Sequence, residues 1–164
     1  MNDLQLIQQA RKALSFAYAP YSGYSVAAAL LTGDGRVYVG VNVENTSYGL
    51  TLCAERAAVA AAVSDGQRHM TALAVVSAKK PDPLPCGACR QVLAEFAANC
   101  RILVSGEGGD AVEYRLEDLF PRPFQFNGTK TPSKGVKMQE DMNNKCRAAK
   151  EKDSPALPVR DHHE

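Results

Sequence analysis

The spacing of apolar residues over the first 120 positions predicts alternating helices and strands. Apolar side chains recur every three or four positions over residues 4–17, which predicts an amphipathic helix with Asp3 as its N-cap. Denser apolar runs over 25–32 and 37–41 predict two strands. The Gly-Asp-Gly turn between these runs indicates that the two strands form a hairpin.

The next part of the chain continues this alternation. An alanine-rich stretch over 53–64 predicts a helix, and the unbroken apolar run over 72–77 predicts a strand in the middle of a sheet. After a proline-rich loop, the pattern predicts a helix, two strands and a helical turn over 87–98, 102–105, 112–115 and 116–119. The order predicts an α/β fold, a three-layer α/β/α sandwich in which helices cover both faces of a mixed sheet of about five strands.

The character of the sequence changes near residue 127. Residues 127–164 contain eight Lys or Arg and six Asp or Glu, but no aromatic residue and only one Leu. Such a segment buries too little apolar surface to offset the entropy of ordering it. We therefore expect a folded domain over 1–126 and a charged, disordered tail over 127–164.

Charge and cysteine content narrow the class of protein. The net charge is +1, from 19 basic and 18 acidic residues, so no overall field favours nucleic acid or an anionic membrane. The longest apolar run, 57–63, is too short to span a bilayer, and the N-terminal residues do not resemble a secretory signal. Five cysteines in such a chain indicate metal or redox chemistry in a cytoplasmic, reduced protein.

Two short stretches contain the candidate chemistry, and each begins at the predicted start of a helix. They are Cys-Ala-Glu-Arg at 53–56 and Pro-Cys-Gly-Ala-Cys-Arg-Gln at 85–91. A Cys-x-x-Cys pair at a helix start places Cys86 and Cys89 about one turn apart, within reach of one zinc ion, and Cys53 can supply a third ligand. The partial positive charge of a helix N-terminus favours the thiolate forms that bind the metal.

A fourth protein ligand is hard to find in the sequence. Cys100 lies 11 residues beyond Cys89. At the far end of the same predicted helix it would be roughly 16 Å away. Cys146 lies in the expected tail and could reach the site only by folding back. Three ligands with an open position for water are typical of a catalytic zinc site, whereas a structural site is closed by four.

The residues that follow Cys53 suit this interpretation. Glu55 would point its carboxylate at the open position and move a proton of a water molecule made acidic by zinc. Arg56 would hydrogen-bond the thiolates and offset their excess negative charge. Together, Cys-x-Glu and Pro-Cys-x-x-Cys are typical of zinc-dependent deaminases, with Cys in place of the more common first His ligand.

On these residues the chain resembles the small, homotetrameric cytidine deaminases of nucleoside salvage. The resemblance runs from about residue 4 to 124 and includes Tyr-Ser-x-Tyr at 21–24 and Gly-Val-Asn-Val-Glu-Asn-x-Ser-Tyr-Gly at 40–49. It implies a catalytic domain over 1–126 that assembles into a homo-oligomer. It also implies one Zn²⁺ per subunit, with Glu55 as proton shuttle and Cys53, Cys86 and Cys89 as zinc ligands.

The resemblance also implies how a nucleoside is held. Asn42 and Glu44 would hydrogen-bond the ribose hydroxyls, although these two side chains could instead simply cap a turn. Further substrate contacts would come from Tyr24, Ala54, Tyr48 and, from a neighbouring subunit, Phe124.

Two of these positions depart from the family pattern. The family usually carries Phe at the position of Tyr24, so the hydroxyl of Tyr24 needs a partner or solvent. Phe124 follows Pro-Arg-Pro rather than the usual Gly-Ala, and a place in the core is the alternative for it.

The predicted activity is the hydrolysis of cytidine, and of 2'-deoxycytidine, to the uridine product and ammonia in pyrimidine salvage. One alternative is a deaminase of a bulkier cytosine nucleoside such as blasticidin S. Another is a zinc-stabilised binding module without activity. A polynucleotide substrate is disfavoured because the site loops lack clustered Lys, Arg and aromatic residues. We expect neither a nucleic-acid nor a membrane partner.

Overall fold

The computed structural model describes residues 1–107 and 110–126, so the tail expected over 127–164 lies outside the described residues. Within them, the helices are α1 (Asp3–Ala13), α2 (Ala54–Ser64), α3 (Gly87–Phe96) and α4 (Leu116–Leu119). The strands are β1 (Val26–Thr32), β2 (Val37–Val41), β3 (Met70–Ser77), β4 (Arg101–Ser105) and β5 (Ala111–Arg115). Short 3₁₀ turns cover Leu14–Phe16 and Tyr48–Leu50. The predicted order of helices and strands is confirmed.

The five strands form one mixed sheet in the order β2-β1-β3-β4-β5. Strands β3 and β4 are parallel, and each of the other neighbouring pairs is antiparallel. The central strand β3 is buried at all but one of its positions, as its unbroken apolar run predicted. The expectation of a mixed sheet of about five strands is confirmed.

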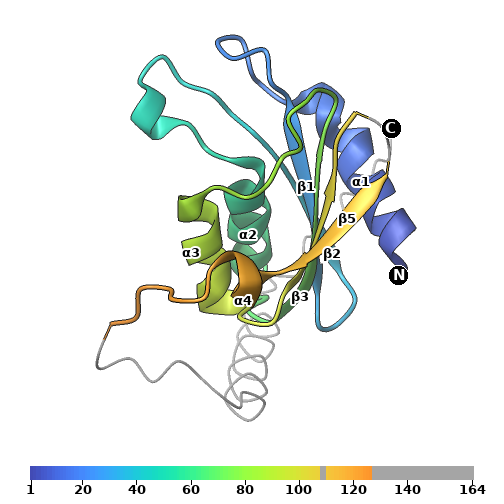
Figure 1. Ribbon diagram of the computed structural model, residues 1–164, viewed down its shortest axis with the longest axis vertical. Coiled ribbons are helices and arrows are strands. Elements are labelled where there is room, and N and C mark those ends of the chain that lie inside the picture. The colour runs from blue at the N-terminus through green and yellow to red at the C-terminus, as the bar shows by residue number, and fades with distance from the viewer. Residues whose placement is uncertain (108–109, 127–164) are drawn as a thin grey trace, which may run out of the picture. The chain divides into compact units, whose positions relative to one another are not determined.

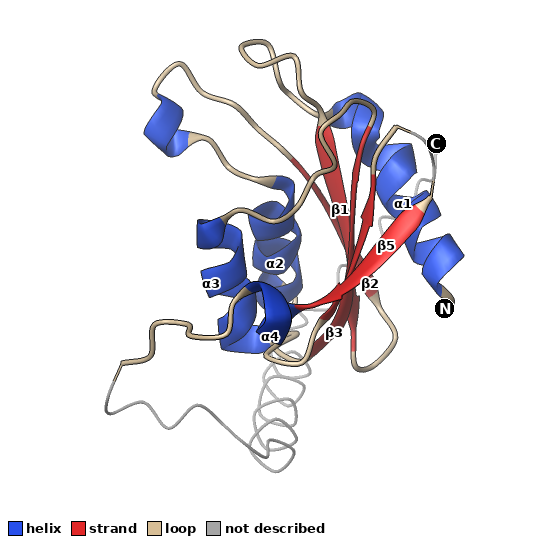
Figure 2. Ribbon diagram, viewed as in Figure 1, coloured by secondary structure: helices blue, strands red, loops and turns tan. Residues whose placement is uncertain are grey.

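Helices cover both faces of this sheet, as Figures 1 and 2 show. Leu6, Ile7 and Ala10 of α1 pack on one face against small side chains of β1 and β3. Helices α2, α3 and α4 lie on the other face, where Ala58 and Leu93 belong to the larger core cluster. The three-layer α/β/α sandwich is therefore confirmed.

Helix α2 approaches the edge strand β2 unusually closely. A Cβ atom at Gly40 would lie 2.3 Å from the carbonyl oxygen of Ala54 and 2.4 Å from the amide nitrogen of Ala58. Only glycine fits there, because these neighbours are main-chain atoms of a helix and cannot move independently. This contact fixes the start of α2, which carries Glu55, against the end of β2.

Three loops meet at one end of the sheet, where α2 and α3 begin (Figure 1). The loop that follows β2 closes on itself, because Val43 and Leu52 exchange two backbone hydrogen bonds of 2.9 and 3.0 Å. Tyr18, from the loop before β1, pairs with Val43 on its other side. The third loop, 78–86, joins β3 to α3. Residues far apart in the sequence thus converge next to Cys53.

The ends of two helices differ from the sequence prediction. Asn2, not Asp3, caps α1, because the Asn2 side chain accepts from the Gln5 amide and the Gln5 side chain accepts from the Asn2 amide. Helix α3 stops at Phe96, so Cys100 lies beyond the helix and immediately before β4. Among the described helices, none is long and apolar enough to cross a membrane.

Candidate active site

The three predicted metal ligands come together at the starts of α2 and α3. Cys53 and Cys86 are the N-cap residues of these helices, and Cys89 lies in the first turn of α3. Their sulfur atoms all lie within 4.8 Å of one another, with Cys86 Sγ 3.6 Å from Cys89 Sγ and 4.0 Å from Cys53 Sγ. Three thiols so close together suit a single soft divalent ion such as Zn²⁺.

The electrostatics of the cluster favour negative charge on Cys53 and oppose it on Cys89. A hydrogen bond from Cys89, with help from Arg56, lowers the pKa of Cys53 to about 5. The pKa of Cys89 moves far upward, because its proton is held by the Cys53 thiolate and because it is buried. A divalent cation displaces the thiol protons when it binds, because thiolates rather than thiols are metal ligands.

Arg56 provides a test of whether the cluster suits a cation. Its Nη2 donates to the carbonyl oxygen of Thr51 at 2.9 Å and to Cys53 Sγ at 3.6 Å. Its buried Nε has no hydrogen-bond partner within the described part of the chain. The guanidinium of Arg56 is directed at a cysteine ligand and has one N–H donor unused by the described residues. It can therefore offset the excess negative charge of three thiolates on Zn²⁺. The residues present therefore fit the metal.

Glu55 lies between Cys53 and Arg56 in the chain, in the first turn of α2. Only 5% of its surface is exposed. Burial raises the pKa of the Glu55 carboxyl, and the neighbouring Cys53 thiolate raises it further. A carboxyl with a raised pKa can both take up and release a proton near neutral pH.

Among the described residues, the metal-ligand grouping contains these three cysteines and no fourth candidate. Cys100 is buried elsewhere, and its Sγ donates to the carbonyl oxygen of Arg101 at 3.4 Å. Cys100 was predicted to lie at the far end of the helix that begins near Cys86. That position was wrong, because α3 ends at Phe96. Cys146 lies outside the described residues.

The predicted ribose-binding side chains organise the loop before β1. Asn42 Nδ2 donates to the carbonyl oxygen of Tyr24 at 2.9 Å, and Asn42 Oδ1 accepts from the amide of Val26 at 2.9 Å. Glu44 Oε2 accepts from the amides of Tyr21 and Ser22 at 2.9 and 3.1 Å. These bonds link segments 16 to 23 residues apart, so neither side chain merely caps a local turn.

Glu44 is held as a carboxylate. The Ser22 hydroxyl donates to Glu44 Oε1, and this bond is the main reason that the pKa of Glu44 falls below its usual range. A carboxylate oxygen accepts about two hydrogen bonds, so Oε2 is fully used by the two amides, whereas Oε1, which accepts only from Ser22, retains acceptor capacity. Ser22 belongs to the Tyr-Ser-x-Tyr stretch at 21–24, but its role as a partner of Glu44 was not evident from the sequence.

The hydroxyl of Tyr24 finds partners at the end of β3 and in the third loop. It donates to the carbonyl oxygen of Pro81, and its oxygen lies 3.3 Å from Ser77 Oγ. The need for a partner, which the sequence raised, is thus met within the protein. The carbonyl oxygen of Tyr24 accepts from Asn42, so Tyr24 lies directly beside the predicted ribose contact.

The remaining predicted contacts are more scattered. Ala54 is fully buried at the start of α2. Tyr48 is 67% exposed in the loop after β2, where its ring lies 6.3 Å from that of Tyr21. Phe124 is 74% exposed, so within this chain it is not the core residue that was the alternative.

The backbone of Phe124 is nevertheless fixed in place by Gln91. Gln91 Nε2 donates to the Phe124 carbonyl oxygen at 3.0 Å, and Gln91 Oε1 accepts from the Phe124 amide at 2.8 Å. This role of Gln91 was not predicted from the sequence. Its position two residues after Cys89 was the only signal, and it does not indicate which partner Gln91 has.

Comparison with known proteins agrees with this geometry. Residues 1–105 match the family model described as cytidine and deoxycytidylate deaminase zinc-binding region. A cytidine deaminase of Halalkalibacterium halodurans is 48% identical over 126 residues, which cover 76% of this chain and 95% of that protein. The crystal structure of cytidine deaminase from Burkholderia pseudomallei superposes with a TM-score of 0.72 at 43% identity, covering 76% of this chain and 100% of that one. The chain belongs to the cytidine and deoxycytidylate deaminase family.

A more distant relative bears on the alternative substrate. A blasticidin-S deaminase of Bacillus cereus is 29% identical over 133 residues, which cover 76% of this chain and 94% of that protein. The similarity to the cytidine deaminase of Halalkalibacterium halodurans is much higher, at 48% identity.

Proposed function

We propose that this protein is a zinc-dependent hydrolase that converts cytidine to uridine and ammonia. The observation that carries the proposal is the grouping of three cysteine sulfurs within 4.8 Å, next to the buried carboxyl Glu55. Cys53, Cys86 and Cys89 would hold the ion. When bound, Zn²⁺ supplies Lewis-acid activation of a water molecule.

The residues of the chain divide the remaining work. Glu55 takes a proton from the water and delivers it to N3 of the cytosine ring while the water oxygen adds to C4. Glu55 then delivers the second proton to the amino group, the C4–N bond breaks, and ammonia leaves. The raised pKa of Glu55 suits this double role, because the carboxyl must accept a proton and release it again.

We propose that Asn42 and Glu44 bind the ribose. Both are largely buried at the end of β2, with 8% and 7% exposure, and both are oriented by backbone bonds. The unused acceptor capacity of Glu44 suits sugar hydroxyl donors, and a site built for these hydroxyls discriminates against compounds that lack them. This pair favours a plain nucleoside, cytidine or 2'-deoxycytidine, over a bulkier derivative.

The central test is Glu55→Gln, which keeps the shape of the side chain but removes its proton-transfer capacity. We expect bound zinc to be retained and turnover of cytidine to fall by about 10²–10⁴-fold, the usual contribution of a general acid–base. Zinc content measured by metal analysis and the loss of cytidine absorbance provide the two readouts. Glu95→Gln, on the exposed side of α3, is the matched control. Near wild-type turnover in Glu55→Gln would exclude this mechanism.

A substrate panel separates the alternatives. Cytidine, 2'-deoxycytidine, cytosine and blasticidin S are assayed for ammonia release before and after chelation of the metal. We expect the two nucleosides to be deaminated only by the zinc-loaded protein. Preference for blasticidin S would favour a deaminase of bulkier cytosine nucleosides, and a zinc-loaded protein that releases no ammonia would favour a binding module.

We also propose the setting in which the enzyme works. It acts in pyrimidine salvage in the cytoplasm as a homotetramer, with residues 1–126 as its catalytic domain. The exposed Phe124, whose backbone Gln91 holds, is suited to complete the site of a neighbouring subunit. Aromatic residues are enriched where protein surfaces meet, which suits a contact of Phe124 with another copy of the chain.

A further inference from the structure

We propose that the hydroxyl of Tyr24 is a positioning group that ties the nucleoside-binding loop to the loop leading into the zinc ligands. The inference rests on the proposed function and deepens it. It concerns two segments, the sugar loop (residues 19–25) and the ligand loop (residues 78–86). The second of these ends at Cys86.

Counting protons identifies the principal bond. A tyrosine hydroxyl has one proton, and the carbonyl oxygen of Pro81 can only accept. Tyr24 therefore donates to Pro81, across a separation of 57 residues in sequence. The proton of Ser77 is already directed to the carbonyl oxygen of Lys79 at 2.6 Å, so the 3.3 Å approach of Tyr24 to Ser77 Oγ is secondary.

A second bond joins the same two loops. Lys79 Nζ donates to the carbonyl oxygen of Gly23 at 2.8 Å. The residues involved, Gly23 with Tyr24 and Lys79 with Pro81, are neighbours within each loop. Two bonds between short segments restrain relative rotation as well as separation, which one bond would not do. We refer to these two bonds as the loop clamp.

Each loop is also connected to one half of the active site. Asn42 and Glu44 hold the sugar loop through the Tyr24 carbonyl oxygen and the amides of Tyr21 and Ser22. At the other end, Arg90 Nε donates to the carbonyl oxygen of Pro85 at 2.7 Å, which fixes the residue before Cys86. The loop clamp therefore lies on a continuous path from the ribose contacts to the metal ligands.

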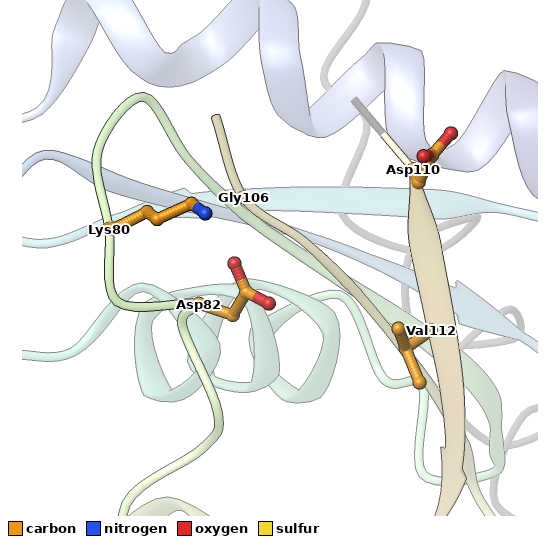
Figure 3. A pocket seen from close by; sticks show the side chains of 5 residues that line it. All are labelled: Lys80, Asp82, Gly106, Asp110 and Val112. Carbon is orange, nitrogen blue, oxygen red and sulfur yellow. The ribbon is translucent and has the colours of Figure 1, made fainter. Parts of the chain in front are cut away.

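Packing alone does not hold the ligand loop. The loop borders an open cavity of about 290 Å³, lined by Lys80, Asp82, Gly106, Asp110 and Val112. Figure 3 shows the side chains of Lys80 and Asp82 extending from the loop on the side of this cavity. The Asp82 side chain lies close to Gly106, which follows β4, since a Cβ there would lie 2.1 Å from Asp82 Oδ1. A loop with free space beside it depends on hydrogen bonds for its position.

The consequence for the reaction is preorganisation. If the loop clamp is broken, the two loops must become ordered when the nucleoside binds. The entropy lost in ordering them weakens the binding. Once the nucleoside is bound, the chemical step involves Glu55 and the metal ligands. None of these residues takes part in either hydrogen bond of the clamp. The Michaelis constant should therefore change more than the turnover number.

The test is Tyr24→Phe, which removes one oxygen atom and keeps the aromatic ring. We expect the KM for cytidine to rise about three- to tenfold, the factor for one hydrogen bond of ordinary strength, with kcat changed less than about twofold. In the zinc-loaded protein without substrate, the amides of the ligand loop should exchange hydrogen faster. Lys79→Met, which leaves the ring of Tyr24 in place, should shift both readouts in the same direction.

Tyr38→Phe is the matched control. It also removes a tyrosine hydroxyl that is hydrogen-bonded, in this case to Asp65, well away from both loops in the fold. Its KM and its exchange over residues 78–86 should match the wild type. The proposal is overturned if Tyr24→Phe exchanges like the wild type in this loop, or if its KM does not exceed that of Tyr38→Phe. Because exchange is measured without substrate, it remains informative even if the protein does not deaminate cytidine.

Discussion

At the scale of single residues, the site depends on how a few side chains are paired. Cys53 is a low-pKa thiol because Cys89 and Arg56 both stabilise its thiolate. Glu55, two residues later, is shifted in the opposite direction because it is buried and lies near that thiolate. The start of α2 thus supplies both a metal ligand that stays charged, Cys53, and a carboxyl that can hold a proton, Glu55.

Arg56 gives the first residue-scale prediction. Arg56→Gln removes the charge that offsets the thiolates and leaves the hydrogen bond to Cys53 weaker. We expect zinc affinity to fall by about 10–100-fold, as for other residues that support metal ligands. Competition with a chromophoric chelator measures the affinity.

Arg36→Gln serves as the comparison, because Arg36 is exposed and pairs with Asp34 and Asp65 outside the metal cluster. Zinc affinity in this variant should equal that of the wild type. If Arg56→Gln also binds zinc with wild-type affinity, the assignment of Arg56 as the group that balances the cysteines is incorrect.

At the scale of elements, the backbone of α2 packs very closely against β2 at Gly40. Gly40→Ala would place a methyl group on the backbone of α2, so we expect a loss of about 3 kcal/mol in the free energy of unfolding. For a domain of this size that corresponds to a Tm lower by roughly 10 °C. Thermal unfolding followed by circular dichroism measures the change.

The comparison for this substitution is Gly49→Ala, where an added Cβ would meet nothing within 4 Å. Its melting temperature should stay within a degree or two of the wild type. Equal melting temperatures for the two variants would mean that β2 and α2 can separate without cost, against the packing described above.

The sequence predicted elements better than it predicted their contacts. The starts of α2 and α3 followed from local signals, because Cys53 and Cys86 precede clear helical patterns. The first helix was predicted to run to Ala17, since apolar spacing continues, but α1 ends at Ala13 and is followed by a 3₁₀ turn over Leu14–Phe16. The turn allows Tyr18 to pair with Val43, and a local pattern contains no information about a partner 25 residues away.

The same distinction applies to the candidate site. The cysteines, Glu55 and Arg56 were found from spacing alone, because all of them lie within one helical turn of a helix start. The bonds of Tyr24 to Pro81 and of Gln91 to Phe124 were not found. Each joins segments that only the folded sheet brings together, so their partners could not be inferred from either segment.

At the scale of the whole molecule, the exposed surface is as informative as the core. Phe124, Tyr48 and Leu50 are 74%, 67% and 71% exposed, although all three are large and apolar. For Phe124 the exposure is combined with a backbone held at two points by Gln91, so the main chain that carries the ring has a defined position. Such an arrangement suits contact with another protein surface, where aromatic residues are enriched.

A mixing experiment tests whether Phe124 acts on a neighbouring subunit. Phe124→Ala alone should lower kcat/KM for cytidine roughly tenfold, the effect of losing an aromatic anchor at a binding site. Glu55→Gln alone should be nearly inactive. When both variants are coexpressed, roughly a quarter of the sites would combine an intact Glu55 with an intact Phe124 from the next subunit, by random pairing in a closed oligomer.

Activity of the mixed oligomers should then exceed the average of the two separate variants by several-fold, because only sites built from two different chains regain both groups. Coexpression of Glu55→Gln with the wild type should give simple dilution, which sets the baseline for the comparison. Activity equal to the average of the two variants would place Phe124 in its own subunit's site or in none. In that case the bidentate hold of Gln91 on Phe124 would serve only to fix the chain after α4 against α3.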